Sequence, residues 1–135
     1  MIVVDTSALI AIAFAEPERE AFIRAIEESG KALISSVSVV EARMVVYGRR
    51  GHRAVVMLDD LLRLPVFELV APGPAEADAA YAAFVAYGKG SGHPAGLNFG
   101  DVFSYALAKR HGLPLLFKGE DFAQTDIPSA LAVPR

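Results

Sequence analysis

Short apolar runs alternate with longer, mostly helical stretches along the whole chain. The apolar runs are rich in aliphatic residues and predict buried strands at 1–5, 31–34, 66–70 and 114–117. The stretches between them, ended by proline or glycine, predict helices at 6–15, 18–28, 35–49, 53–63, 74–87 and 98–111. Strands that alternate with helices indicate an α/β fold, in which a central parallel sheet of about four to five strands is flanked by helices.

Length and composition narrow the class of protein further. The 135 residues are expected to form one domain, 1–135. Hydrophobic residues make up 53% of the chain, yet no apolar run approaches the roughly 18 residues of a membrane span. The absence of cysteine excludes disulfides and thiolate-bound zinc, and a cytoplasmic location is expected. The net charge of −3 argues against a generally basic nucleic-acid binder, although the basic side chains cluster locally at Arg43, Arg49, Arg50 and Arg53.

Four acidic residues fall where predicted strands end or helices begin. Asp5 closes the first strand, Glu41 lies early in a helix, Asp101 opens another helix, and Asp121 follows the last strand. The carboxyl ends of parallel strands meet at one edge of a sheet, so these acids are expected to lie together. Clustered carboxylates repel each other unless a divalent cation lies between them. The pattern therefore predicts a magnesium or manganese site and, with it, phosphodiester chemistry.

Two of these acids also have ordinary structural explanations. Asp5 could simply cap a helix, although Thr6 and Ser7 could do so equally well. The spacing of Ser38 and Glu41 fits a capping box, in which the glutamate bonds back to the cap residue. If a serine further upstream caps the helix instead, Glu41 becomes a charge in a largely apolar stretch, and such charges need a partner or a metal.

The other two acids leave similar alternatives open. Asn98 and Asp101 have the spacing of a helix cap followed by a favourable acid in the first turn. Asp121 could belong to a solvated acidic turn, and Glu120 competes with it as the fourth ligand because spacing alone cannot choose between them.

Three segments of the chain resemble a known family. The opening Ile2–Leu9, with sequence IVVDTSAL, is similar to the start of PIN-domain proteins. Residues 97–108 (LNFGDVFSYALA) and 115–122 (LLFKGEDF) resemble later blocks of the VapC toxin branch of that family. The resemblance implies a PIN fold and a Mg²⁺-dependent endoribonuclease, with Mn²⁺ as a possible substitute. Carried over residue by residue, the family's acids are Asp5, Glu41, Asp101 and Asp121.

The resemblance also implies roles and partners. We assign Asp5 and Asp101 as the principal metal ligands, whereas Glu41 and Asp121 would complete the site, hold a second metal or orient the attacking water. The expected partners are an RNA substrate, a VapB-type antitoxin and a second copy of the chain in a homodimer. The alternative is a catalytically silent module of the same fold that binds metal or antitoxin only.

Two surfaces are expected to serve these partners. The arginine cluster could hold RNA phosphates, although a solvated helix face is an equal alternative. The first two predicted helices carry more apolar residues than a small domain is expected to bury, so an antitoxin segment is expected to cover part of them. The residues concerned are Leu9, Ile10, Ile12, Phe14, Phe22, Ile23 and Ile26.

Overall fold

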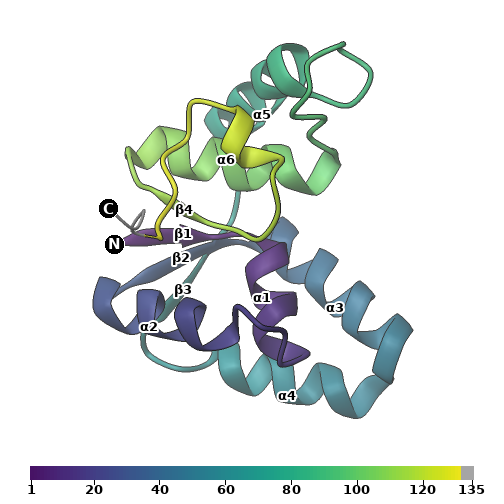
Figure 1. Ribbon diagram of the computed structural model, residues 1–135, viewed down its shortest axis with the longest axis vertical. Coiled ribbons are helices and arrows are strands. Elements are labelled where there is room, and N and C mark those ends of the chain that lie inside the picture. Colours follow the sequence, from purple (N-terminus) through teal and green to yellow (C-terminus); the bar gives the residue numbers. More distant parts are fainter. Residues whose placement is uncertain (132–135) are drawn as a thin grey trace.

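The computed structural model describes residues 1–131, in which four parallel strands form one sheet (Figure 1). The strands are β1 (Ile2–Val4), β2 (Ala32–Ser35), β3 (Phe67–Val70) and β4 (Leu115–Leu116), in the order β3-β2-β1-β4. Val3 pairs with Leu33 of β2 on one side and with Leu115 of β4 on the other. The predicted α/β fold with a central parallel sheet is confirmed.

Two helices follow each of the first three strands. They are α1 (Thr6–Ala13), α2 (Arg19–Ser29), α3 (Ser36–Arg50), α4 (His52–Leu62), α5 (Pro74–Tyr87) and α6 (Phe99–His111), and a short 3-10 helix, η1 (Phe122–Gln124), follows β4. The first helix ends two residues earlier than expected, because Ala15 adopts a positive φ of 52°. Among residues 1–131, no helix is both long and apolar enough to cross a membrane.

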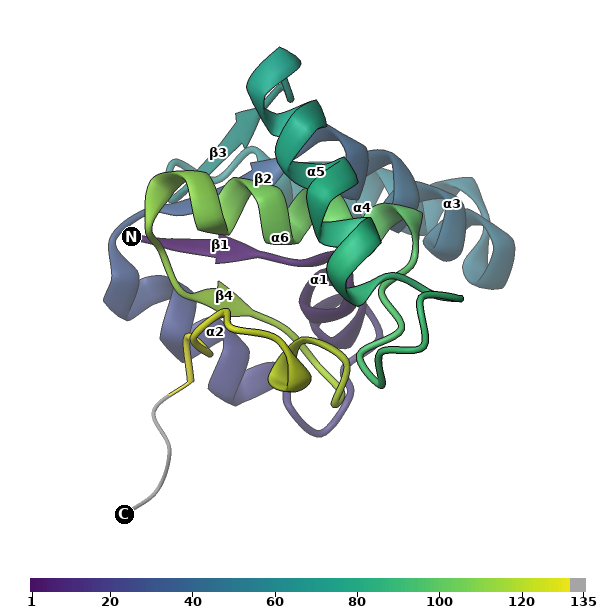
Figure 2. The same cartoon turned by 90° about the horizontal axis from the view of Figure 1, so that it is seen from above.

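The side chains of β1, β2 and β4 alternate between two hydrophobic cores. Ile2 and Val4 point to a core shared with α1 to α4, whereas Val3 points to a core shared with α5 and α6. This period of two is the geometry of a strand buried on both faces. Figures 1 and 2 show the result, with α5 and α6 on one side of the sheet and α1 to α4 on the other.

The expectation that the first two helices leave a large apolar surface is wrong. Leu9, Ile10, Ile12, Phe22 and Ile26 are all buried. They belong to the core beneath the sheet, where α1 packs against both α2 and α3. Of the seven residues expected to need a partner, only Phe14 and Ile23 remain partly exposed. Exposed apolar side chains lie instead on α3, α4, α5 and the start of α6, among other positions.

Candidate active site

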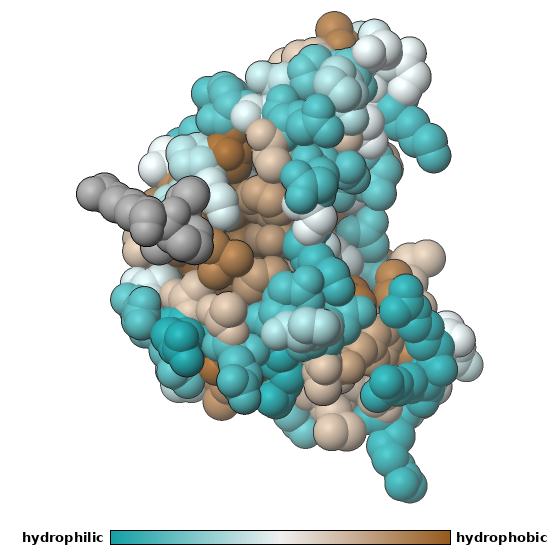
Figure 3. All heavy atoms as spheres, viewed as in Figure 1, coloured by the Kyte–Doolittle hydropathy of each residue, from teal (hydrophilic) through white to brown (hydrophobic). Residues whose placement is uncertain are grey.

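The carboxyl end of β1 lies at a change of direction in the sheet. The chain moves from β1 to β2 and β3 on one side, and β4 then returns to the other side of β1. The connections that leave β1 and β4 therefore diverge, and the crevice between them is the usual place for a ligand in an open parallel sheet. The space-filling view shows the molecule hollowed on this side, between α5 and α6 above and α3 and α4 below (Figure 3).

Asp5 occupies this position and is held by hydrogen bonds to both carboxylate oxygens. Its side chain is only 2% exposed. Ser104 Oγ donates to Oδ1 at 2.6 Å, and Ser7 donates to Oδ2 through both Oγ, at 2.7 Å, and its backbone N–H, at 2.9 Å. Asp5 therefore caps α1, as its simpler explanation predicted, and at the same time presents a buried carboxylate at the sheet edge.

Buried hydroxyl groups connect Asp5 to the neighbouring elements. Ser104 Oγ lies 3.1 Å from Ser38 Oγ, and the Thr6 hydroxyl donates to the backbone oxygen of Ser38 at 3.2 Å. Ser7 Oγ also accepts the backbone N–H of Lys118, at 3.0 Å, just after β4. Hydrogen bonds of this kind fix the orientation of a carboxylate before any ligand binds.

Asp101 lies in the first turn of α6 and takes part in a capping box. Its backbone N–H donates to Asn98 Oδ1 at 2.9 Å, and its Oδ2 accepts the backbone N–H of Asn98 at 3.0 Å. Within residues 1–131, Asp101 Oδ1 makes no hydrogen bond. The capping explanation is therefore correct for one oxygen, while the other remains available to a ligand.

The pKa of Asp101 is raised by its burial and, to a smaller extent, by the three other acids. Burial is the largest cause and raises this pKa from 3.8 to about 7. The backbone N–H of Asn98 opposes the rise, and the negative charges of Asp5, Glu41 and Asp121 add to it. Four separate segments of the chain thus bring four acids to one edge of the sheet, where the charges of the other three raise the pKa of Asp101.

Glu41 lies in the second turn of α3 and is not part of a capping box. Ser35 caps α3 instead, because its side chain accepts the Val37 backbone N–H at 3.2 Å. Ser38, the cap that the sequence spacing suggested, is buried and faces Ser104. The Glu41 carboxylate is directed toward the start of α6, where it packs against the backbone of Gly100.

Asp121 follows β4 and directly precedes η1 without capping it. Among the described residues, Asp121 rather than the neighbouring Glu120 is the acid of this turn whose charge raises the pKa of Asp101. The turn is tied to Asp5 through Ser7, which accepts the N–H of Lys118. This placement favours Asp121 over Glu120 as the fourth acid of the site.

The donor set suits a hard divalent cation. Carboxylate oxygens are the ligands that Mg²⁺ and Mn²⁺ prefer, and a cation would relieve the repulsion that raises the pKa of Asp101. Within residues 1–131, however, no group of three or more His, Cys, Asp or Glu side chains is placed so that it could hold a metal ion. The acids are gathered at one edge without being closed around a common point.

The predicted arginine cluster divides into two parts. Arg43 forms an ion pair with Asp59, at 2.8 Å between Nε and Oδ1. The guanidinium carbons of Arg49 and Arg50 lie 5.1 and 4.6 Å from the centre of the Phe14 ring. Since Arg49 follows Glu41 by eight residues of α3, it lies about 12 Å further along the helix axis. Arg49 and Arg50 are thus separate from the acids along α3, whereas Arg43 is only two residues from Glu41.

Ser104 and Gly100 were not predicted as parts of the site, and Ser38 was expected only as a helix cap. A signal for Ser104 was present, because this small polar residue interrupts an apolar helix three positions after Asp101 and so shares its face. The contacts of Ser38 and Gly100 join α3 to α6, and no local pattern reveals them.

Comparison with known proteins identifies close relatives along the whole chain. Residues 2–128 match the family described as PIN domain. The Ribonuclease VapC30 of Mycobacterium tuberculosis (strain H37Rv) is 48% identical over 132 residues, which cover 98% of this chain and 99% of that protein. Ribonuclease VapC of Mycolicibacterium smegmatis is 46% identical over 125 residues, covering 93% of this chain and 96% of that protein.

A solved structure shares the fold at lower identity. It is VapC20 of Mycobacterium tuberculosis, described as a sarcin–ricin loop cleaving toxin, which superposes with a TM-score of 0.79 at 19% identity. The match covers 98% of this chain and 100% of VapC20. The arrangement of strands and helices is therefore that of a known toxin, whereas the details of the site are those of this chain.

Proposed function

The chain belongs to the PIN-domain family and is a ribonuclease of the VapC type, and from this premise we propose that it cleaves RNA with the help of a divalent cation. In this proposal the protein is the toxin of a type II toxin–antitoxin pair. It consists of one domain and acts in the cytoplasm. Asp5 and Asp101 are the principal ligands of Mg²⁺ or Mn²⁺, and Glu41 and Asp121 complete the site. The convergence of four acids supports this proposal: burial of Asp101 and the charges of Asp5, Glu41 and Asp121 raise the pKa of Asp101 to about 7.

Hydrogen bonds orient the carboxylates of Asp5 and Asp101. Ser7 and Ser104 hold the carboxylate of Asp5 in one orientation. The backbone N–H of Asn98 holds Oδ2 of Asp101 and leaves Oδ1 for a ligand. Asp5 and Asp101 would hold the cation, which would supply charge stabilisation at the scissile phosphate and an acidified water as the nucleophile.

The arginines at the end of α3 and the start of α4 are proposed to hold the RNA backbone. Arg49, Arg50 and Arg53 are exposed and lie away from the acids, so they contact phosphates on either side of the cleaved bond. Arg43 contributes less, because its guanidinium is already paired with Asp59. These contacts position the strand and carry no sequence information.

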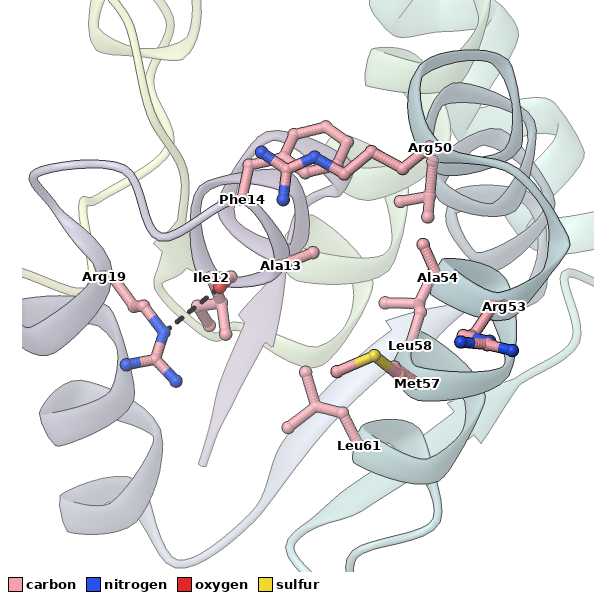
Figure 4. Close-up of a pocket in the computed structure, with 11 residues that line it drawn as sticks. Ile12, Ala13, Phe14, Arg19, Arg50, Arg53, Ala54, Met57, Leu58 and Leu61 are labelled. Carbon is pink, nitrogen blue, oxygen red and sulfur yellow. Dashed lines mark hydrogen bonds between the residues drawn. The ribbon is translucent and has the colours of Figure 1, made fainter.

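The antitoxin is proposed to bind a hollow between α1 and α4. This hollow has a volume of about 400 Å³ and an apolar floor that includes Phe14, Met57 and Leu61 (Figure 4). Arg50 and Arg53 lie at its edge, and Arg19, which donates to the backbone oxygen of Ile12, closes the other side. Such a surface fits a VapB-type segment that carries apolar side chains flanked by acids.

The proposed homodimer uses a different face. Exposed apolar side chains follow α3 and α5 and meet at Phe99, which is 74% exposed at the start of α6. In a two-fold symmetric dimer, this apolar face of one chain would pack against the same face of the second copy. The side chains concerned are Val40, Met44, Tyr47, Tyr81, Phe84 and Phe99.

RNA cleavage with and without Mg²⁺ tests the proposed function. Wild-type protein should cleave single-stranded RNA with Mg²⁺ or Mn²⁺ and lose this activity in EDTA, whereas Asp101→Asn should be inactive in both conditions. The exposed Asp78 of α5 lies outside the site, so Asp78→Asn is the matched control and should retain activity. Cation-independent cleavage, or full activity in Asp101→Asn, would refute the proposed mechanism.

A further inference from the structure

Gly100 is a glycine whose backbone does not require one. It is the second residue of α6, it is buried, and its φ lies outside the left-handed region that favours glycine. Glycine is less favourable than alanine inside a helix, because it loses more conformational freedom on folding. The explanation for Gly100 must therefore be the space that its missing side chain leaves.

The carboxylate of Glu41 occupies that space. A Cβ atom added to Gly100 would lie 2.5 Å from Cδ of Glu41 and closer still to both carboxylate oxygens. Non-bonded carbon atoms prefer a separation of about 3.5 to 4.0 Å, so an alanine here and the present position of Glu41 exclude each other. Since α3 packs against α6 at this point, the contact joins the two helices that carry Glu41 and Asp101.

A displaced Glu41 has somewhere to go. Its side chain lines an open hollow of about 530 Å³ on the outer side of α3, together with Val40, Met44 and Phe99. The part of Glu41 that meets the added Cβ is the end of a flexible side chain, so the helices need not separate. Alanine at position 100 would turn the carboxylate into the hollow and away from Asp101.

We infer that Gly100 is a positioning residue, whose lack of a side chain keeps the Glu41 carboxylate against the first turn of α6, where it can act with Asp101 on the same cation. This inference rests on the proposed metal-dependent function. It assigns a role in cation binding to a residue that offers no ligand atom.

The affinity of the full chain for Mn²⁺ tests the inference. It is measured by electron paramagnetic resonance and, separately, as the Mn²⁺ concentration that gives half-maximal RNA cleavage. Gly100→Ala should weaken Mn²⁺ binding by about tenfold or more, as loss of a supporting contact does at metal sites. Without cation, its melting temperature should equal or exceed that of wild type. Gly48→Ala is the matched control, because Gly48 is an exposed helical glycine with no atom within 4 Å of an added Cβ.

A double-mutant cycle shows whether the effect passes through Glu41. Glu41→Ala removes the overlapping carboxylate, so adding Gly100→Ala to it should cause no further loss of Mn²⁺ affinity. A further loss in the double variant would overturn the inference, as would wild-type affinity in Gly100→Ala. Failure of Gly100→Ala to fold would also overturn it, because Glu41 would then be unable to yield. If wild type neither binds Mn²⁺ nor cleaves RNA, the proposed function fails and the inference fails with it.

Discussion

Replacement of Asp101 by asparagine should stabilise the cation-free protein, and the gain should grow with pH. Folding raises the pKa of this carboxyl from 3.8 to about 7, mainly through burial. Between these values the folded protein keeps a proton that the unfolded chain has already lost. The wild type therefore loses stability as the pH rises from about 4 to about 7, and Asp101→Asn, which has no such proton, does not.

The structure sets the size of this effect. One pKa unit corresponds to about 1.4 kcal/mol, so the full rise to about 7 would cost about 4 kcal/mol at pH 8. Asp101 is partly exposed, and solvent screening reduces that figure to about 1 to 2 kcal/mol. For a chain of 135 residues this corresponds to a rise in melting temperature of about 3 °C or more.

Urea unfolding of both proteins in EDTA at several pH values measures the difference. The stability of Asp101→Asn minus that of wild type should be small near pH 4.5 and should reach its full value near pH 8. Asp78→Asn, on the exposed side of α5, is the control for the loss of one carboxylate. If the difference in stability between Asp101→Asn and wild type stays constant across this pH range, burial near the other acids does not raise the pKa of Asp101.

Three further changes test other parts of the site. Asp5→Asn should reduce RNA cleavage by about 100-fold or more while the circular dichroism spectrum is unchanged, and wild-type turnover would remove Asp5 from the mechanism. Ser104→Ala should lower the free energy of unfolding by about 1 to 3 kcal/mol, because it leaves Asp5 and Ser38 each short of a buried partner; an unchanged urea midpoint would contradict this. Changing Arg49, Arg50 and Arg53 together to alanine should weaken RNA binding and reduce its salt slope by up to about 2, while Mn²⁺ binding stays intact; an unchanged slope would place the RNA elsewhere.

Local sequence determined the elements of this fold and the positions of its acids. The period of two in the buried strands and the stops at proline and glycine depend on near neighbours, so they could be read without a structure. The same holds for the placement of Asp5 after the first strand and Asp101 in the first turn of a helix. The sequence also showed that these acids could be helix caps. Asp5 and Asp101 do take part in helix capping, and both also lie at the candidate site.

The tertiary structure decided what the elements do together. The order β3-β2-β1-β4 places β4 beside β1 and so brings the turn with Asp121 to Asp5. Burial of α1 and α2 overturned the expected apolar surface, because their apolar stripes meet the sheet and α3 rather than solvent. Ser104 reaches Asp5 across 99 residues of sequence, and Gly100 meets Glu41 only where α3 and α6 pack. Contacts of this kind arise from the packing of whole elements: the pattern within α6 marks Ser104 as an unusual polar residue, but it does not identify Asp5 or Glu41 as the partners of α6.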